Sequence, residues 1–131
     1  MTEPFRDAGR IATDAPPTRR FRDADYAPLA ATLAELRQRI DDVDAQVVAL
    51  LAQRALCVRD ATRFKRDERQ VAAPERQAEV FDRVRAMAAA QAPGFPELPD
   101  IVEAAYRSLV AGFVAAEQRL FAETEPTDDE R

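Results

Sequence analysis

The feature that most constrains this chain is an unbroken helical repeat from Leu33 to Lys65. Apolar residues recur there at alternating gaps of three and four, with no Gly or Pro between them. The apolar positions are Leu33, Leu36, Ile40, Val43, Val47, Leu50, Cys57, Ala61 and Phe64. This spacing predicts one long helix with an apolar seam. The helix would span roughly 50 Å, whereas a compact domain of this size has a radius of gyration of about 14 Å. The seam therefore predicts that the helix packs against a second copy of the chain.

The rest of the pattern predicts two shorter helices, so the expected fold class is all-α with three helices per chain. The long helix is expected to start near Pro28 or Leu29, where a proline suits the first turn, and to end near Lys65 or Arg66. A second helix is expected over residues 74–91 and a third over residues 100–121.

Three segments follow from this pattern. Residues 1–28 contain four prolines and no periodicity, which predicts a flexible N-terminal arm. Residues 29–122 form the expected helical domain, and residues 123–131 form an acidic tail.

Composition excludes several classes of function. The 131-residue chain has a net charge of −5 and no basic patch, which argues against nucleic-acid binding. No apolar run approaches the ~18 residues of a membrane span, and the N-terminus lacks an apolar leader, so a cytoplasmic protein is expected. A single cysteine excludes an internal disulfide.

The chain has no histidine, which excludes a Ser-His-Asp triad and argues against zinc. An enzyme of this composition is expected to need no metal and no cofactor. Its activity is expected to be flat between about pH 6 and 8, because no histidine titrates there.

One cation breaks the apolar pattern of the long helix, and a second lies just past the end of the pattern. Arg54 stands where the seam requires an apolar residue, and Lys65, the only lysine, follows eleven residues later. That separation is about 16 Å of rise and about 20° from exact alignment, so both project along one face and could flank a small dianion. Alternatively, Arg54 reaches solvent or pairs with a carboxylate such as Asp44, and Lys65 interacts with the helix C-terminus.

Three further side chains are candidates for binding. Arg37 lies 28 residues before Lys65, roughly 42 Å along the axis, so one ligand could contact both only if Arg37 came from a partner chain. Arg76 stands in the first turn of the second helix, where it could face a ligand or pair with Glu79. Gln118 lies beside the apolar face of the third helix and could point inward as a neutral donor. Taken alone, Arg37 and Gln118 are also typical surface residues.

The chain resembles the AroQ-type, all-helical chorismate mutases over about 90 residues. Five segments carry the resemblance in order: Leu36–Asp44 (LRQRIDDVD), Leu50–Arg54 (LLAQR), Phe64–Lys65, Pro74–Arg76 (PER) and Glu117–Gln118. The resemblance implies an intertwined homodimer with shared active sites, and a place in the shikimate pathway and aromatic amino acid biosynthesis. It also explains the missing histidine, because chorismate rearranges to prephenate in one pericyclic step without obligatory proton transfer. Such a step needs positioning and preorganised charge.

The resemblance also implies roles for single residues. Arg37 would reach a substrate carboxylate in the partner's site, and Arg54 would bind the other carboxylate. Lys65 and Gln118 would donate to the ether oxygen of the breaking bond. Arg76 would order the ring end of the pocket, with Gln77 beside it.

Two departures from the family pattern leave the reaction open. Gln77 stands where most mutases have an acid, and Ala73 stands where many have Asp. Together with the step from Lys65 to Arg76, these features resemble the isochorismate–pyruvate lyase branch, which makes salicylate and pyruvate. The substrate is thus a dianion, chorismate or isochorismate. A third possibility is a non-catalytic helical dimerisation module.

Overall fold

The computed structural model describes residues 18–127 and confirms the all-α prediction. Its elements are α1 (Leu33–Ala61), the 3-10 helix η1 (Thr62–Phe64), α2 (Glu68–Ala72), α3 (Pro74–Gln91) and α4 (Leu98–Ala122). No strand occurs in this part of the chain. The chain divides into two compact units, one ending at Asp41 and the other starting at Asp42. The beginning of the expected arm and the end of the acidic tail lie outside the described residues.

Helix α1 begins at Leu33, four or five residues later than predicted, because a capping box sets its start. The Thr32 hydroxyl accepts from the backbone N–H of Glu35 at 3.1 Å. In return, Glu35 Oε1 accepts from the N–H groups of Thr32 at 3.1 Å and Ala31 at 3.0 Å. These bonds satisfy N–H groups that a helix start leaves without partners.

The connection from α1 to α3 is more structured than a polar loop. After η1, Lys65 is extended, and Asp67 caps α2 by accepting from the Gln70 N–H at 2.8 Å. Ala73 then takes a left-handed conformation with φ 43°, and Pro74 starts α3. A left-handed alanine is strained, so this turn is held by its surroundings.

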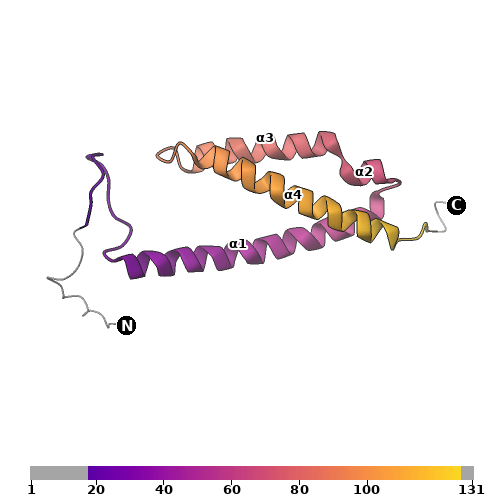
Figure 1. Cartoon of the computed structure of the whole chain (residues 1–131), viewed down its shortest axis with the longest axis horizontal. Coiled ribbons are helices and arrows are strands. Elements are labelled where there is room, and N and C mark those ends of the chain that lie inside the picture. Colours follow the sequence, from indigo (N-terminus) through magenta and orange to yellow (C-terminus); the bar gives the residue numbers. More distant parts are fainter. Residues whose placement is uncertain (1–17, 128–131) are drawn as a thin grey trace. The chain divides into compact units, whose positions relative to one another are not determined.

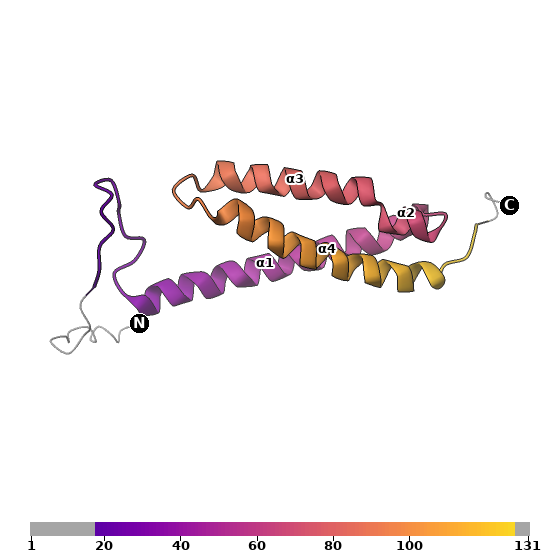
Figure 2. The same cartoon turned by 45° about the horizontal axis from the view of Figure 1, so that its top comes forward.

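Helices α3 and α4 lie side by side and run in opposite directions (Figures 1 and 2). Four buried residues form the core between them, with three partly buried residues packed against it. The buried four are Val80, Phe81, Val84 and Val110; the partly buried three are Val102, Tyr106 and Val114. On α3, Ala88 is also buried, whereas the larger Met87 beside it is 56% exposed.

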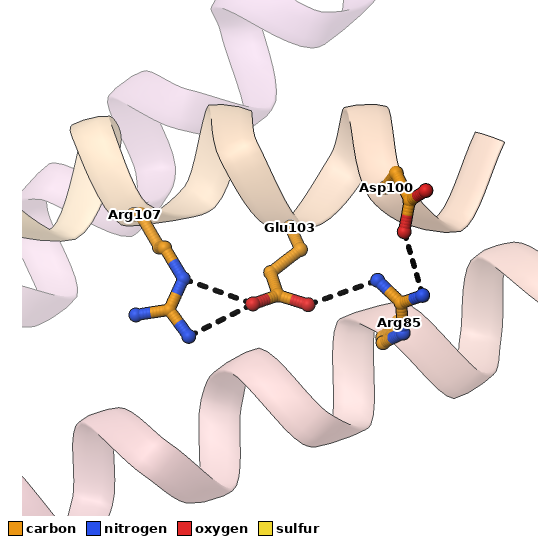
Figure 3. Close-up of polar contacts among 4 residues, drawn as sticks. All are labelled: Arg85, Asp100, Glu103 and Arg107. Carbon is orange, nitrogen blue, oxygen red and sulfur yellow. Dashed lines mark hydrogen bonds and ion pairs between the residues drawn. The ribbon is translucent and has the colours of Figure 1, made fainter. Parts of the chain in front are cut away.

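A chain of ion pairs joins α3 to α4 on their outer side (Figure 3). Arg85 of α3 contacts Asp100 at 2.6 Å and Glu103 at 2.9 Å, and Arg107 contacts Glu103 at 2.8 Å. The hydrogen bonds from Arg107 and Arg85 hold the pKa of Glu103 below its usual value, against a smaller opposing effect of burial. Arg107 also lies 4.5 Å from the ring of Phe81, so the network continues into the core.

Candidate active site

A cavity of about 370 Å³ lies within the second unit, between the end of α1, the turn at α2, and helices α3 and α4. Five charged side chains line it: Arg54, Lys65, Arg76, Arg83 and Glu117. Four of them are cations, which suits an anionic ligand. The remaining walls are largely apolar and include Val71, Val80, Val110 and Phe113.

The structure shows why an arginine is tolerated on the seam at position 54. The Arg54 guanidinium lies 5.0 Å from the ring of Phe113 and 5.9 Å from that of Tyr106, both on α4. Contacts with aromatic faces stabilise a cation without using its hydrogen-bond donors. Arg54 therefore remains able to bind a carboxylate.

Lys65 and Arg76 reach the same cavity from opposite sides of the α2 turn. The Lys65 ammonium donates to the Gln70 carbonyl at 3.2 Å, and this contact orients the side chain while leaving it two further protons. Arg76 Nη1 pairs with Glu79 Oε1 at 3.3 Å on the exposed side of α3, which was one of the two alternatives for Arg76. Such exposed pairs contribute little, so a carboxylate ligand could replace Glu79.

The two glutamines differ in position. Gln77 lines the cavity, and its amide nitrogen donates to the Ala72 carbonyl across the turn. Gln118 does not line it. The Gln118 amide nitrogen donates instead to the Glu68 carbonyl at 3.3 Å, and its Oε1 is buried without a partner among the described residues. Gln118 thus ties α4 to α2 beside the cavity.

The acid that does line the cavity is Glu117, which is only 8% exposed. Its Oε2 lies 3.4 Å from the hydroxyl of Thr62. Burial raises the pKa of the Glu117 carboxyl, against Lys65, the Thr62 hydroxyl and Arg54, which each lower it. Burial therefore acts in favour of the protonated carboxyl, which is a hydrogen-bond donor, while the two cations act against it.

The sequence model of the family described as chorismate mutase type II matches residues 36–118. The chain belongs to this family. Comparisons with curated proteins and with solved structures find no match. Membership makes the chain an isomerase that acts on the small molecule chorismate. The chorismate mutase match contains nothing that favours the lyase branch.

Four of the six side chains that the sequence predicts to bind the substrate line this cavity. They are Arg54, Lys65, Arg76 and Gln77. Arg37 is exposed in the first unit and is not among the lining residues.

Glu117 and Arg83 line the cavity although the sequence predicted no role for either; Glu117 appeared only as the neighbour of Gln118 in the family resemblance. A signal for Glu117 is the stripe Tyr106, Val110, Phe113 and Glu117 on α4, in which an acid takes an apolar position just as Arg54 does on α1. The signal for Arg83 is its spacing of seven residues, about two turns, from Arg76.

The described residues contain neither a candidate metal site nor a candidate membrane span. Within residues 18–127, no three His, Cys, Asp or Glu side chains lie together as metal ligands would. None of the helices described is long and apolar enough to cross a membrane.

Proposed function

We propose that this cavity is where chorismate is converted to prephenate, and that Glu117 takes part as a neutral hydrogen-bond donor. The observation that carries the proposal is the buried carboxyl of Glu117 in a largely apolar cavity whose other four charged side chains are cations. Chorismate is a dianion with an ether oxygen that gains negative charge as its bond breaks. The cavity offers both kinds of partner: cations for the carboxylates and fixed donors for the oxygen.

Each side chain has a role that suits its chemistry. Arg54 binds one carboxylate through its planar guanidinium, and Arg76 leaves Glu79 to order the ring end of the substrate. Lys65 and Glu117 donate to the ether oxygen. Glu117 replaces Gln118 in this role, because Glu117 lines the cavity whereas the Gln118 amide is bonded to Glu68.

The pericyclic step needs no base. The ether C–O bond breaks as the new C–C bond forms, and no proton is lost or gained. The protein therefore acts by holding the enolpyruvyl arm over the ring and by stabilising the developing charge. Because Glu117 must stay protonated, activity is expected to fall on the alkaline side, which replaces the flat profile expected from the absence of histidine.

We further propose that the active form is a homodimer whose sites are shared. None of the side chains of α1 is buried. Five seam residues are each between 46% and 61% exposed: Leu33, Ile40, Val43, Val47 and Leu50. Burying the exposed half of each side chain would contribute about 1 kcal/mol before the cost of association. A second copy of α1 would cover these residues. In such a dimer, Arg37 of each chain would contact a substrate carboxylate in the cavity of the other chain.

A complementation experiment tests the cavity and the dimer together. Arg37→Ala and Lys65→Ala proteins should each be inactive. Mixed in equal amounts under subunit exchange, they should regain about a quarter of the wild-type sites, because half of the dimers are mixed and one of their two sites is intact. Mixing each variant with itself is the control. Verified heterodimers without activity would contradict shared sites.

A further inference from the structure

Thr62 and Glu117 are the two buried polar residues of the described chain, 2% and 8% exposed, and their side chains meet. The Thr62 hydroxyl oxygen has two neighbours that compete for its proton. It lies 3.0 Å from the carbonyl oxygen of Val58 and 3.4 Å from Glu117 Oε2. Thr62 directly follows the last residue of α1, and its hydroxyl faces the Glu117 carboxyl on α4.

A hydroxyl carries one proton and can also accept hydrogen bonds, whereas a carbonyl can only accept. When the Thr62 proton is given to Val58, the hydroxyl can form a hydrogen bond with Glu117 only as an acceptor, and that bond requires a protonated Glu117. When Glu117 is ionised, the bond forms only if the Thr62 proton turns to the carboxylate, and the Val58 carbonyl then loses this donor. The direction of one hydroxyl proton is thus coupled to the protonation of Glu117.

We propose that Thr62 is a positioning residue that controls whether Glu117 carries a proton. The effect of Thr62 on the protonation of Glu117 does not depend on the proposed function. Its effect on catalysis does: Thr62 sets the pH range over which Glu117 donates a hydrogen bond to chorismate.

The other groups around Glu117 show why Thr62 can be tested separately. Arg54 from α1 and Lys65 from the segment after η1 lower the pKa of Glu117, against burial, which is the larger effect and raises it. Cys57 of α1 and the α3 residues Arg76 and Arg83 line the same cavity, and α2 contributes no titratable lining residue. Thr62 also lowers the pKa of Glu117, and it is uncharged. Its hydroxyl can therefore be removed without changing the net charge of the site.

The test compares Thr62→Val, which keeps the shape and removes the hydroxyl, with Thr62→Ser, which keeps the hydroxyl. The first readout is the titration of the Glu117 carboxyl by carbon NMR, assigned by the signal that Glu117→Gln removes. The second is the pH dependence of kcat/KM for chorismate. Thr62→Val should move both the titration and the alkaline fall in activity to higher pH by the same amount. Thr62→Ser should leave both near their wild-type positions.

An unchanged Glu117 titration in Thr62→Val would overturn the proposal. A titration that moves while the activity profile stays in place would uphold the control by Thr62 and overturn the role of Glu117 in the proposed function. Far-UV circular dichroism establishes that each variant is folded. If Thr62→Val is unfolded, Thr62→Ala provides the same comparison with a smaller side chain.

Discussion

Replacing Arg54 by leucine separates the two explanations for an arginine on an apolar seam. If Arg54 binds a substrate carboxylate, Arg54→Leu removes that interaction and restores the seam. If Arg54 is needed for folding, activity and stability should fall together.

The magnitudes follow from the contacts of Arg54. The substitution loses contacts with Phe113 at 5.0 Å and Tyr106 at 5.9 Å, and a cation–aromatic contact at a partly exposed site contributes about 0.5–1 kcal/mol. A half-buried leucine should return about 1 kcal/mol. The free energy of unfolding should therefore change by no more than about 1 kcal/mol. Losing two charge-assisted hydrogen bonds to a carboxylate should cost about 3–6 kcal/mol, which lowers kcat/KM roughly 10²–10⁴-fold.

The assay pairs chorismate turnover with urea unfolding at a fixed protein concentration, because the stability of the proposed dimer would depend on concentration. Arg59→Leu is the matched control, since Arg59 is exposed on the same helix and does not line the cavity. It should keep its activity. A loss of more than about 3 kcal/mol of stability in Arg54→Leu would indicate a structural role. Wild-type activity in Arg54→Leu would refute the assignment of this cavity.

Three other predictions concern single side chains. Lys65→Gln keeps a donor but removes the charge, and should lower kcat about 10²–10³-fold in a steady-state assay; an effect on KM alone would contradict its role at the ether oxygen. Ala73→Val places a β-branched residue at φ 43° and should destabilise the protein by at least about 1–2 kcal/mol in urea unfolding, whereas Ala73→Gly should not. Since the folded-state pKa of Glu103 is lowered, this group stabilises the protein above its unfolded-state pKa, and that stabilisation is lost as pH falls through the folded-state pKa. Glu103→Gln should therefore be less stable than wild type at neutral pH, with the difference closing in acid; an equal difference at all pH values would contradict this ion pair.

Most of the fold was predictable because periodicity and proline mark it clearly. The bounds of α3, Pro74–Gln91, are those predicted. The predicted bounds of α4 differ from the observed ones by two residues at the start and one at the end. The start of α1 was predicted too early because Pro28 was preferred over the capping box at Thr32. The short helix α2 was missed because five residues carry no periodic signal.

The site was predictable where a charge interrupts an apolar pattern, and less so elsewhere. Arg54 was singled out in this way and Lys65 as the only lysine, just past the seam, and both line the cavity. Gln118 was chosen because it lies near the apolar face, but one residue on a helix is a rotation of about 100°, and the side chain on the cavity is that of Glu117. The left-handed conformation of Ala73 sets the direction in which α3 starts, and therefore the positions of Arg76 and Gln77. It could not be predicted, because alanine rarely adopts this conformation and no neighbouring residue signals it.

The most direct test of the account is NMR observation of chorismate incubated with the wild-type protein in D₂O. The account predicts that prephenate accumulates as the product, with no deuterium on carbon and with a chemical step nearly as fast as in H₂O, because the rearrangement moves no solvent proton. Isochorismate incubated in parallel serves as the comparison substrate. Recovery of unchanged chorismate, or deuterium incorporation with a large solvent isotope effect, would contradict a pericyclic chorismate mutase at this site.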